Sequence, residues 1–587
     1  MKKGYFMVEV PEGFRLMDTS RFMNADGTIR PRLLTEALDH AVATWPDRVC
    51  VDFLGREWTY GEIGNLVDRV ATGLQAEGLE PGDRFGLCLP NTPYSVIMFY
   101  AVLRAGGMVV NINPLYSQSE VEFLITNAGA KMVAVPDLEL LHSKVAKAWG
   151  KADEAGHVPL QKVVLCPMAD VLSFWKSVGL RTVKRSSLAQ RQDGIAYLDY
   201  RDLAAHPANP APVKQDPEDV AVLQYTGGTT GRPKGAMLTH RSLAANSAQM
   251  MLHVGVERDQ QERTLGVLPL FHVFALTCVL NFGIDTGSEL VLLPRFEMDE
   301  VLKCVKRKPP TQMFGVPTIY NALGSLPDDK VPDLSSVLTS CSGGAPLPLE
   351  VRMQFEKRTG SIVSEGYGLT EASPIITSNP LLGRQPVKEN SAGPAFPHTI
   401  IELRDEKGEL VEGIGPDHRG EICARGPQIM KGYWNRPDAT KDTFFGESLR
   451  TGDIGYLDKD GYLFIVDRIK DLILCSGYNV YPRMIEDAAY EHPAVKEAVA
   501  IGVPDDYRGE APKLFIALHD GEDLDAATLH AFLKMRLNPI EMPDSYEFRD
   551  ELPKTLVGKL EKKALVAEEK AKRDAAAATA TDGGLNA

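Results

Sequence analysis

Short apolar runs and amphipathic segments alternate along the first two thirds of the chain. The runs at 48–54, 83–89 and 108–111 have the length and composition of buried strands. The segments 60–77 and 95–105 between them place apolar residues at helical spacing. Because strands and helices alternate, the pattern predicts an α/β fold with mostly parallel strands, continuing to about residue 400.

From residue 400 the pattern changes to short strands that are separated by hairpin-type turns. The turns at 405–408 and 458–461 both end in glycine. A small β-barrel or sandwich is therefore expected over about 400–469. Residues 471–565 then predict a compact α+β unit with helices at 483–492 and 524–537.

The two ends of the chain have weaker patterns. Residues 1–30 are expected to form an extended leader. Residues 566–587 are rich in alanine and end near two glycines, so a disordered tail is expected there.

Composition limits the classes of protein that fit. The chain has 587 residues, which predicts at least two domains. Its formal net charge of −15 argues against general nucleic-acid binding. The 8 cysteines show no CxxC pair, which argues against a zinc site or a disulfide framework and favours the cytosol. No apolar run reaches about 18 residues, so no transmembrane helix is predicted.

One stretch, from Tyr225 to Gly235, has the composition of a phosphate-binding loop. It reads Tyr-Thr-Gly-Gly-Thr-Thr-Gly-Arg-Pro-Lys-Gly. Glycine allows close approach to an anion, and successive backbone N–H groups form an anion-binding concavity. A predicted strand at 220–223 precedes it and a predicted helix at 238–251 follows, so we expect phosphates between strand and helix. A flexible surface hairpin is the simpler alternative.

The loop is not a Walker A motif, because Gly231 precedes arginine and Lys234 precedes glycine. It resembles the phosphate loop of the adenylate-forming superfamily, which includes acyl-CoA synthetases, adenylation domains and luciferases. The resemblance implies a multi-layer N-terminal AMP-binding domain over 31–469 and a small mobile C-terminal domain over 470–565. It assigns phosphate binding to Thr226, Gly227, Gly228, Thr229, Thr230, Gly231 and Lys234, with Thr230 also near the metal.

Further motifs follow in the order that the superfamily uses. His272, within Leu-Pro-Leu-Phe-His-Val-Phe, would lie beside the acyl carboxylate, and Val273 and Leu276 would line the acyl pocket. Taken alone, a histidine among apolar residues is more often part of the core. The ATP site implied by the resemblance further includes Gly343, Gly344, Ala345, Glu365, Gly366, Tyr367, Gly368, Thr370, Asp453 and Arg468.

The resemblance also gives several of these residues a role. Tyr367 would stack on adenine, Thr370 would bond the α-phosphate, and Asp453 would bind the ribose. Glu371 would hold Mg²⁺, for which a carboxylate is a suitable ligand. In isolation, Tyr367 fits a packed turn and Glu371 a solvated surface position.

The last motifs place the hinge and a catalytic lysine. Arg468 would contact ribose or phosphate, Lys470 would be the hinge, and Gly477 would lie where pantetheine passes. Lys559, in Pro-Lys-Thr-Leu-Val-Gly-Lys, matches the superfamily's adenylation lysine. Lys554 in the same motif is expected to be solvated.

The implied reaction joins a fatty acid, ATP and CoA in two steps. The acid attacks ATP to give acyl-AMP and pyrophosphate, and CoA then takes the acyl group as a thioester. The motifs look most like those of long-chain fatty acid–CoA ligases, but Leu276 stands where some members have a gating tryptophan. Medium-chain, dicarboxylic or aryl acids stay open, as do an acyl-AMP ligase that serves a separate carrier protein and a lipid-binding uptake protein.

One segment, 172–185, combines aromatic and apolar residues with four basic ones. It fits either a solvated surface helix or peripheral contact with an anionic membrane surface. The expected location is cytoplasmic, with any such contact on the inner face of a membrane. A homodimer is compatible with the sequence.

Overall fold

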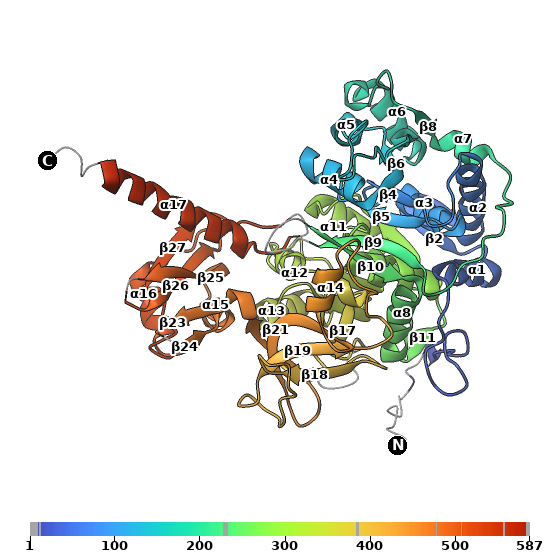
Figure 1. The fold of residues 1–587 in the computed structure, drawn as a ribbon. Helices are drawn as coiled ribbons and strands as arrows, with labels where there is room; N and C mark the ends of the chain where they lie inside the picture. Colours follow the sequence, from blue (N-terminus) through green and yellow to red (C-terminus); the bar gives the residue numbers. More distant parts are fainter. Residues whose placement is uncertain are drawn as a thin grey trace.

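The computed structural model describes residues 10, 13–226, 233–382, 387–476, 478–505, 507–555 and 558–582. Figure 1 shows a large body of sheets and helices, with a smaller unit in orange to red on one side of it. The smaller unit contains the strands and helices that follow residue 470. The fold is therefore α/β, with a separate C-terminal domain.

The first large sheet holds seven strands in the order β10-β9-β5-β4-β6-β7-β8. Neighbouring strands are parallel, except that β10 at the edge is antiparallel to β9. The strands are β4 (Arg84–Leu87), β5 (Met108–Asn111), β6 (Ala130–Pro136), β7 (Lys162–Cys166), β8 (Tyr197–Asp199), β9 (Val220–Thr226) and β10 (Lys234–Thr239).

Strand β10 shifts the start of the helix expected at 238–251 to His240. Lys234 lies opposite Thr226 in an antiparallel pairing with β9, and helix α8 (His240–Val254) begins only after β10. Thr239 fixes that start, because its Oγ1 accepts a hydrogen bond from Ser242 N at 3.0 Å. Antiparallel pairing with β9 thus keeps the backbone extended for two residues beyond the expected start of the helix.

The second large sheet holds eight strands in the order β17-β16-β15-β14-β12-β13-β2-β3. Its inner pairs are parallel, and the pairs at both edges are antiparallel. The strands are β2 (Val49–Phe53), β3 (Arg56–Thr59), β12 (Arg263–Gly266), β13 (Glu289–Leu292), β14 (Gln312–Gly315), β15 (Thr339–Ser342), β16 (Ser364–Gly368) and β17 (Ile375–Ser378).

Helices pack against both large sheets. The helix expected at 60–77 is α2 (Tyr60–Ala76). It begins at a capping box, in which Glu62 N donates to Thr59 Oγ1 and Thr59 N donates to Glu62 Oε2. The other helices of this body outside the site are α1 (Leu34–Thr44), α3 (Pro93–Arg104), α4 (Gln118–Ala128), α5 (Glu139–Ala146), α6 (Phe174–Thr182), α7 (Tyr200–Ala205), α11 (Met298–Arg307), α12 (Pro317–Gly324), α13 (Leu349–Thr359) and α14 (Pro437–Asp442).

The N-terminal leader, where it is described, packs against this body. Strand β1 (Phe14–Leu16) pairs with β11 (Val256–Arg258). Phe22 is fully buried, and Arg21 donates a hydrogen bond to Asp285 O at 2.9 Å. The described part of the leader is therefore anchored along the body.

The β-rich unit expected at 400–469 is an antiparallel sheet of five strands. Its order is β18-β19-β21-β20, and β22 pairs with β21. The strands are β18 (Ile400–Arg404), β19 (Gly420–Arg425), β20 (Phe444–Phe445), β21 (Ser448–Leu457) and β22 (Leu463–Arg468).

The C-terminal domain also has a five-stranded sheet, in the order β24-β23-β26-β25, with β27 paired to β26. Its elements are β23 (Ile473–Cys475), β24 (Tyr478–Val480), α15 (Pro482–Tyr490), β25 (Val495–Asp505), β26 (Gly509–Leu518), α16 (Ala526–Leu533) and β27 (Ser545–Arg549). Helix α16 lies within the expected range 524–537, and α15 overlaps the expected range 483–492 but begins one residue earlier.

The segment expected to be a disordered tail instead contains helix α17 (Lys562–Asp582). In Figure 1 this helix extends away from the C-terminal domain. Leu565 near its start is fully buried. Glu568 and Glu569 make ion pairs with Arg549 and Lys513, which tie the first turns to the sheet.

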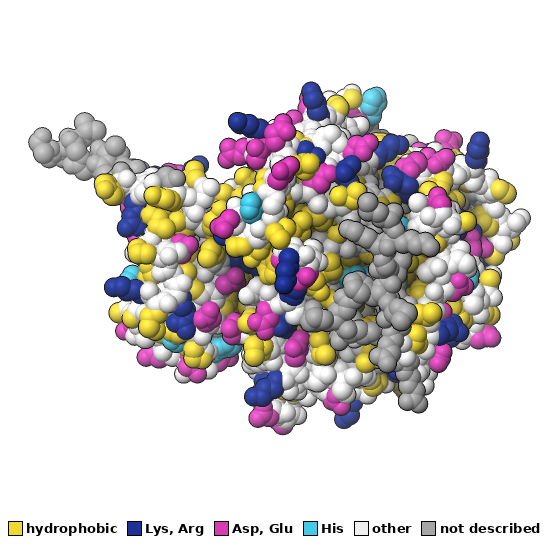
Figure 2. All heavy atoms as spheres, turned by 90° about the horizontal axis from the view of Figure 1, so that it is seen from below, with side chains coloured by type: hydrophobic (Ala, Val, Ile, Leu, Met, Phe, Trp, Pro, Cys, Tyr) yellow, Lys and Arg dark blue, Asp and Glu magenta, His cyan; other side chains and the backbone are white. Residues whose placement is uncertain are grey.

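The surface does not separate into regions of one charge on the face shown in Figure 2, where acidic and basic side chains are mixed with apolar ones. The net charge of −15 is thus not gathered into one acidic patch on that face. Among the described residues, no helix combines the length and apolar character required to cross a bilayer.

Candidate active site

Lys559 reaches from the C-terminal domain into the N-terminal domain. A Cβ built on Gly344 would lie 2.7 Å from Lys559 Cε and 3.0 Å from its Nζ. A tight turn holds the lysine, since Thr555 N donates to Lys559 O at 2.7 Å. At the next residue back, a Cβ on Gly558 would lie 2.8 Å from Thr318 Oγ1. The two domains are therefore in close contact at Lys559.

The surroundings of Lys559 lower the pKa of two groups. Burial, and then the charge of Arg468, lowers the pKa of Lys559 to about 8. Burial, and then the charge of Lys559, lowers the pKa of His272 to about 3. His272 is therefore neutral at physiological pH. Its Nδ1 accepts a hydrogen bond from Phe274 N at 3.3 Å, so the ring proton lies on Nε2.

Tyr367, Asp453 and Arg468 form a connected polar cluster. The Tyr367 hydroxyl donates to Asp453 Oδ2 at 2.5 Å, and Arg468 Nε lies 3.1 Å from Asp453 Oδ1. Asp453 is 6% exposed, and burial raises its pKa while Arg468 opposes that shift. Residues from three separate motifs thus meet at one carboxylate.

Glu371 lies in the 3₁₀ turn η4 (Thr370–Ala372), just after β16. Its Oε1 accepts a hydrogen bond from the hydroxyl of Tyr433 at 2.6 Å. The Nζ of Lys234 lies 5.0 Å from the centroid of the Tyr433 ring. Burial, and then the charge of Glu371, raises the pKa of Tyr433, so this hydroxyl stays protonated. Thr370 and Glu371 therefore lie near the lysine of the phosphate loop.

The glycines assigned to the ATP site have little room for side chains. A Cβ on Gly343 would lie 3.1 Å from the Phe274 ring, and one on Gly366 would lie 2.8 Å from Cys341 Sγ. A Cβ on Gly368 would lie 2.0 Å from Pro374 O. Gly343, Gly344 and Ala345 follow in turn after β15 ends at Ser342. Close packing thus accounts for each of these three glycines, against side chains at Gly343 and Gly366 and against backbone at Gly368.

Glu365, on β16, faces the C-terminal domain. Its Oε1 accepts a hydrogen bond from Leu347 N at 3.4 Å. Burial raises the pKa of Glu365 to about 7, and Arg483 of the C-terminal domain is the largest opposing influence. Glu365 therefore lies where the two domains meet.

The two residues assigned to the acyl pocket are buried behind His272. Val273 starts the short helix α9 (Val273–Ala275), and Leu276 starts a π-helical turn, η3 (Leu276–Asn281), that leads into α10 (Phe282–Asp285). Both side chains are 1% exposed. π-Helical turns occur often at functional sites.

Comparison with known proteins assigns the sequence to one family. The model of the AMP-binding enzyme family matches residues 38–434, and the model of the AMP-binding enzyme C-terminal domain matches residues 484–559. The chain is an AMP-binding enzyme. The first model alone covers more than half of its 587 residues.

Relatives with described activities match this AMP-binding enzyme over most of its length. A long-chain-fatty-acid–CoA ligase from Bacillus subtilis is 40% identical over 92% of this chain and 95% of its own. A feruloyl-CoA synthase from Amycolatopsis is 34% identical over 88% and 94%. The crystal structure of ATP-bound MatB from Rhodopseudomonas palustris superposes with a TM-score of 0.77 at 28% identity, covering 91% of this chain and 98% of that one.

Some predicted site residues of the enzyme lie outside the described part of the chain. They are Gly227, Gly228, Thr229, Thr230, Gly231 and Gly477. The two described ends of the phosphate loop, Thr226 and Lys234, lie opposite each other on β9 and β10. Lys470, the expected hinge, lies in the 3₁₀ turn η5 (Ile469–Asp471) between the two domains of the enzyme.

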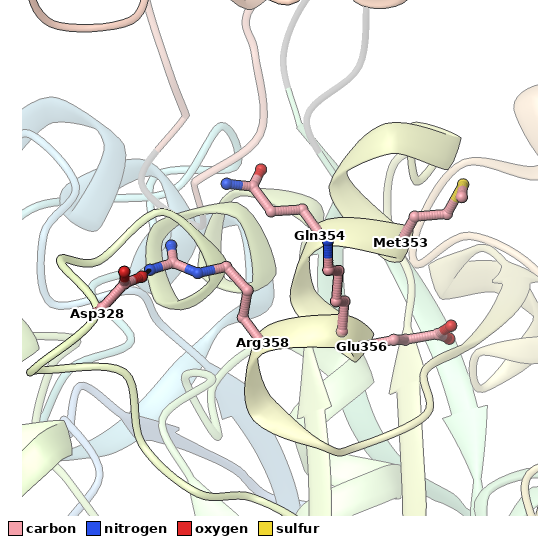
Figure 3. Close-up of a pocket in the computed structure, with 6 residues that line it drawn as sticks. Asp328, Met353, Gln354, Glu356 and Arg358 are labelled. Atoms are coloured by element: carbon pink, nitrogen blue, oxygen red, sulfur yellow. Dashed lines mark hydrogen bonds and ion pairs between the residues drawn. The ribbon is translucent and has the colours of Figure 1, made fainter.

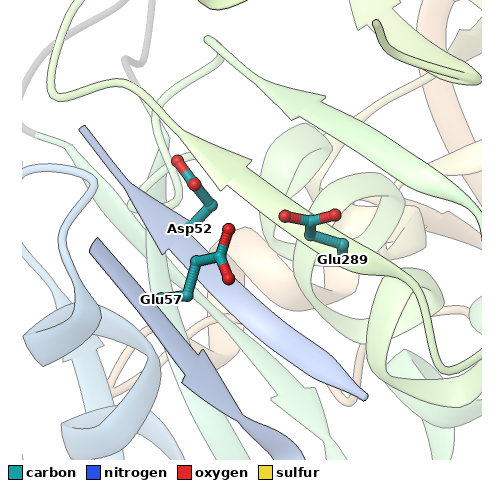
Figure 4. Close-up of side chains that lie close together, drawn as sticks. All are labelled: Asp52, Glu57 and Glu289. Carbon is teal, nitrogen blue, oxygen red and sulfur yellow. The ribbon is translucent and has the colours of Figure 1, made fainter. Parts of the chain in front are cut away.

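A second group of carboxylates in the enzyme has a structural explanation. Asp52, Glu57 and Glu289 lie close together on the second sheet (Figure 4). Arg307 bonds both oxygens of Asp52 at 2.5 and 2.6 Å, and Lys308 bonds Glu57 and Glu289 at 2.7 and 2.5 Å. Because each of the three carboxylates pairs with Arg307 or Lys308, the group is explained as an ion-pair network on the sheet.

A surface depression beside α13 is not part of the site either. Asp328, Met353, Gln354, Glu356, Lys357 and Arg358 line it. In Figure 3, Arg358 points toward Asp328, and its Nη2 bonds that carboxylate at 2.5 Å. None of the assigned site residues of the enzyme lines this depression.

Sequence reasoning missed Tyr433. It follows Lys431 and Gly432 in a segment without a recognisable phosphate or metal pattern. An aromatic residue next to a glycine within the β-rich region was the signal that the sequence offered, and it did not indicate a contact with Glu371.

Proposed function

We propose that this enzyme is an ATP-dependent long-chain fatty acid–CoA ligase. The observation that carries the proposal is the position of Lys559. Its side chain extends from the C-terminal domain to Gly344, and its charge contributes to the lowered pKa of His272. Similarity to a long-chain ligase over nearly the whole chain supports the same conclusion. The arrangement corresponds to the first half-reaction, in which acid and ATP give acyl-AMP.

In that step the substrate carboxylate attacks the α-phosphorus of ATP. A new bond forms between a carboxylate oxygen and the α-phosphorus, the bond between that phosphorus and the oxygen bridging to the β-phosphate breaks, and pyrophosphate leaves with that oxygen. The acid is already ionised near neutral pH, so no side chain has to remove a proton. Lys559 and the Nε2–H of His272 would bind the negative oxygens that meet in the transition state. Tyr367, Asp453 and Arg468 would hold the nucleoside.

The residues around Glu371 fit Mg²⁺. Glu371 offers hard carboxylate oxygens, and one of them is oriented by a hydrogen bond, as is usual for metal ligands. Lys234, at one end of the phosphate loop, lies beside Tyr433, which bonds Glu371, and Thr226 at the other end lies opposite Lys234. When bound, Mg²⁺ would neutralise charge on the phosphates of ATP.

The second half-reaction would need the C-terminal domain to rotate about Lys470. Rotation withdraws Lys559 and admits the thiol of CoA, so that one lid serves two steps. Gly477 would then pass close to pantetheine.

Two classes of acid are candidates for the acyl substrate. Val273 and Leu276 are apolar and buried next to His272 in the chain, which suits a fatty acyl chain, while the feruloyl-CoA synthase relative favours an aryl acid. ATP–pyrophosphate exchange over acids from C6 to C18, with ferulic and dicarboxylic acids included, separates these substrates. We expect the highest exchange with C14 to C18.

Parallel assays with CoA complete this test. CoA should yield thioester without a carrier protein. Exchange without thioester would instead indicate a carrier-protein acceptor. Absence of exchange with every acid would overturn the proposed activity.

We further propose that α6 contacts an anionic membrane surface. Phe174, Trp175 and Val183 are 71%, 80% and 85% exposed. Lys176 and Lys184 lie on the same segment, so apolar and cationic side chains occur together as in interfacial helices. Figure 1 places α6 at the outer end of the N-terminal domain, away from the C-terminal domain.

Binding to lipid vesicles tests this contact. We expect co-sedimentation with vesicles that contain phosphatidylglycerol, weaker binding to pure phosphatidylcholine, and loss of binding in a Phe174→Ser/Trp175→Ser variant. Met353→Ser is the matched control, because Met353 is also exposed, at 57%, but lies on α13. Equal binding by all three proteins would contradict a role for α6.

A further inference from the structure

Tyr433, which lies outside all of the predicted motifs, connects Glu371 to the phosphate-loop region. Its side chain is buried, and its hydroxyl donates to Glu371 Oε1 at 2.6 Å. Its ring faces the ammonium group of Lys234, with Nζ 5.0 Å from the ring centroid. One side chain therefore contacts both the carboxylate assigned to Mg²⁺ and the lysine that ends the loop.

Backbone hydrogen bonds fix the segment that carries Tyr433. Its neighbours pair with β10 on one side and with the turn of Glu371 on the other. These bonds run from Met237 N to Gly432 O, from Trp434 N to Gly235 O and from Met430 N to Glu371 O, and each is 2.8 Å long. The phenol is thus placed by the same strand that follows the phosphate loop.

We propose that Tyr433 is a positioning residue for the metal-binding carboxylate of Glu371. An ionised carboxylate has about four acceptor positions. A hydroxyl bound to one oxygen fixes the rotation of the carboxylate and leaves positions for the metal. Loss of such a partner typically reduces metal affinity by about 10- to 100-fold. The inference rests on the proposed role of Glu371.

Tyr433→Phe isolates the hydroxyl, because the ring beside Lys234 is retained. Calorimetric titration of the full-length enzyme with ATP, once with Mg²⁺ and once with EDTA, measures binding without turnover. We expect Mg²⁺–ATP to bind about tenfold or more weakly to the variant, and metal-free ATP to bind within about twofold of wild type. An equal loss under both conditions, or no loss, would overturn the positioning role.

Two further variants separate the possible explanations. Tyr60→Phe is the matched control, since it also removes a buried hydroxyl, which donates to Ser288 O at 2.7 Å, and neither residue is assigned to the site. It should leave both titrations unchanged. Glu371→Gln tests the underlying assignment. If it does not weaken Mg²⁺–ATP selectively, the metal role of Glu371 is wrong. If it does and Tyr433→Phe does not, only the role of Tyr433 is wrong.

A larger substitution tests the ring. Tyr433→Leu should add a loss of metal-free ATP binding, because the cation–π contact with Lys234 is removed along with the hydroxyl. Because the ratio of the two affinities is measured on one preparation, it reports the metal effect even where a variant is less stable. A Tyr433→Leu variant that binds metal-free ATP like Tyr433→Phe would show that the ring does not position Lys234.

Discussion

At the scale of single residues, the protonation states near Gly344 match the proposed chemistry. His272 has its pKa lowered to about 3 and stays a neutral hydrogen-bond donor. Lys559 has its pKa lowered to about 8 and is still mostly charged near neutral pH. In the described part of the chain no carboxylate forms an ion pair with Lys559, and a partly buried cation without such a partner is costly. The negative charge of bound substrates would compensate for it.

Removal of Lys559 should separate the two half-reactions. We expect Lys559→Ala to lower the rate of acyl-AMP formation by about 100- to 1000-fold, the usual cost of a lost transition-state donor. Thioester formation from supplied acyl-AMP should stay near normal. Single-turnover assays of each half measure both rates.

Lys554→Ala is the matched control on the same turn. Lys554 pairs with Glu497 and Glu551 at 2.7 and 2.8 Å, so it is engaged within the C-terminal domain. The Lys554→Ala variant should retain both acyl-AMP formation and thioester formation. A folded Lys559→Ala protein that catalyses neither half-reaction would contradict the assignment of Lys559 to acyl-AMP formation.

The pKa of Lys559 also predicts a pH dependence. The charged form is the active one, so kcat/KM for ATP in adenylation should fall by about tenfold per pH unit once the pH exceeds about 8. Arginine stays charged at every usable pH. The residual activity of Lys559→Arg should therefore show no fall between pH 8 and about 10. A wild-type profile that stays flat to pH 10 would show that the charge of Lys559 does not matter.

At the scale of elements, strong local patterns predicted the structure well. Helix α2 occupies Tyr60–Ala76 within the expected 60–77, and β5 lies at the expected 108–111. Strand β10 was not predicted; it pairs with β9, which precedes the phosphate loop, and on its other side with a segment about 200 residues away that no local pattern indicates. The order of motifs indicated the members of the site. The contact between Tyr433 and Glu371 depends on that same distant pairing and left no trace in local sequence.

The 3₁₀ turn η5 is the element on which rotation would depend. Proline at Lys470 fixes φ and restricts Ile469 before it. We expect Lys470→Pro to keep adenylation within about threefold while slowing thioester formation by about 100-fold or more, since a lid step limits only the second half. Rapid-quench assays of each half-reaction measure both rates in the variant and in the wild-type enzyme.

Lys459→Pro serves as the control for the hinge variant. Lys459 lies in the turn between β21 and β22 at a position that accepts proline. It should leave both halves unchanged. Normal overall turnover by Lys470→Pro would show that this turn is not the hinge.

At the scale of the whole molecule, the closed arrangement can be fixed by a covalent bond. A Cβ at Gly558 would lie 2.8 Å from Thr318 Oγ1, and a cysteine Sγ at 318 would take the place of that oxygen. The Cβ of one cysteine and the Sγ of the other would thus lie close enough for a disulfide, in which the two Cβ atoms lie about 3.5–4.5 Å apart. The positive φ of 83° at Gly558 costs roughly 1–2 kcal/mol for a cysteine there. The 8 native cysteines are buried, which limits mispairing.

We expect the oxidised Thr318→Cys/Gly558→Cys enzyme to complete one adenylation turnover and then to stall with acyl-AMP bound. The domain that carries Lys559 could not move away to admit CoA. Reduction with dithiothreitol should restore thioester formation, because only the disulfide prevents rotation. Each single-cysteine variant, oxidised in the same way, should turn over normally and so controls for the substitutions. Thioester formation at the wild-type rate by the fully cross-linked enzyme would rule out domain rotation as the step between the two half-reactions.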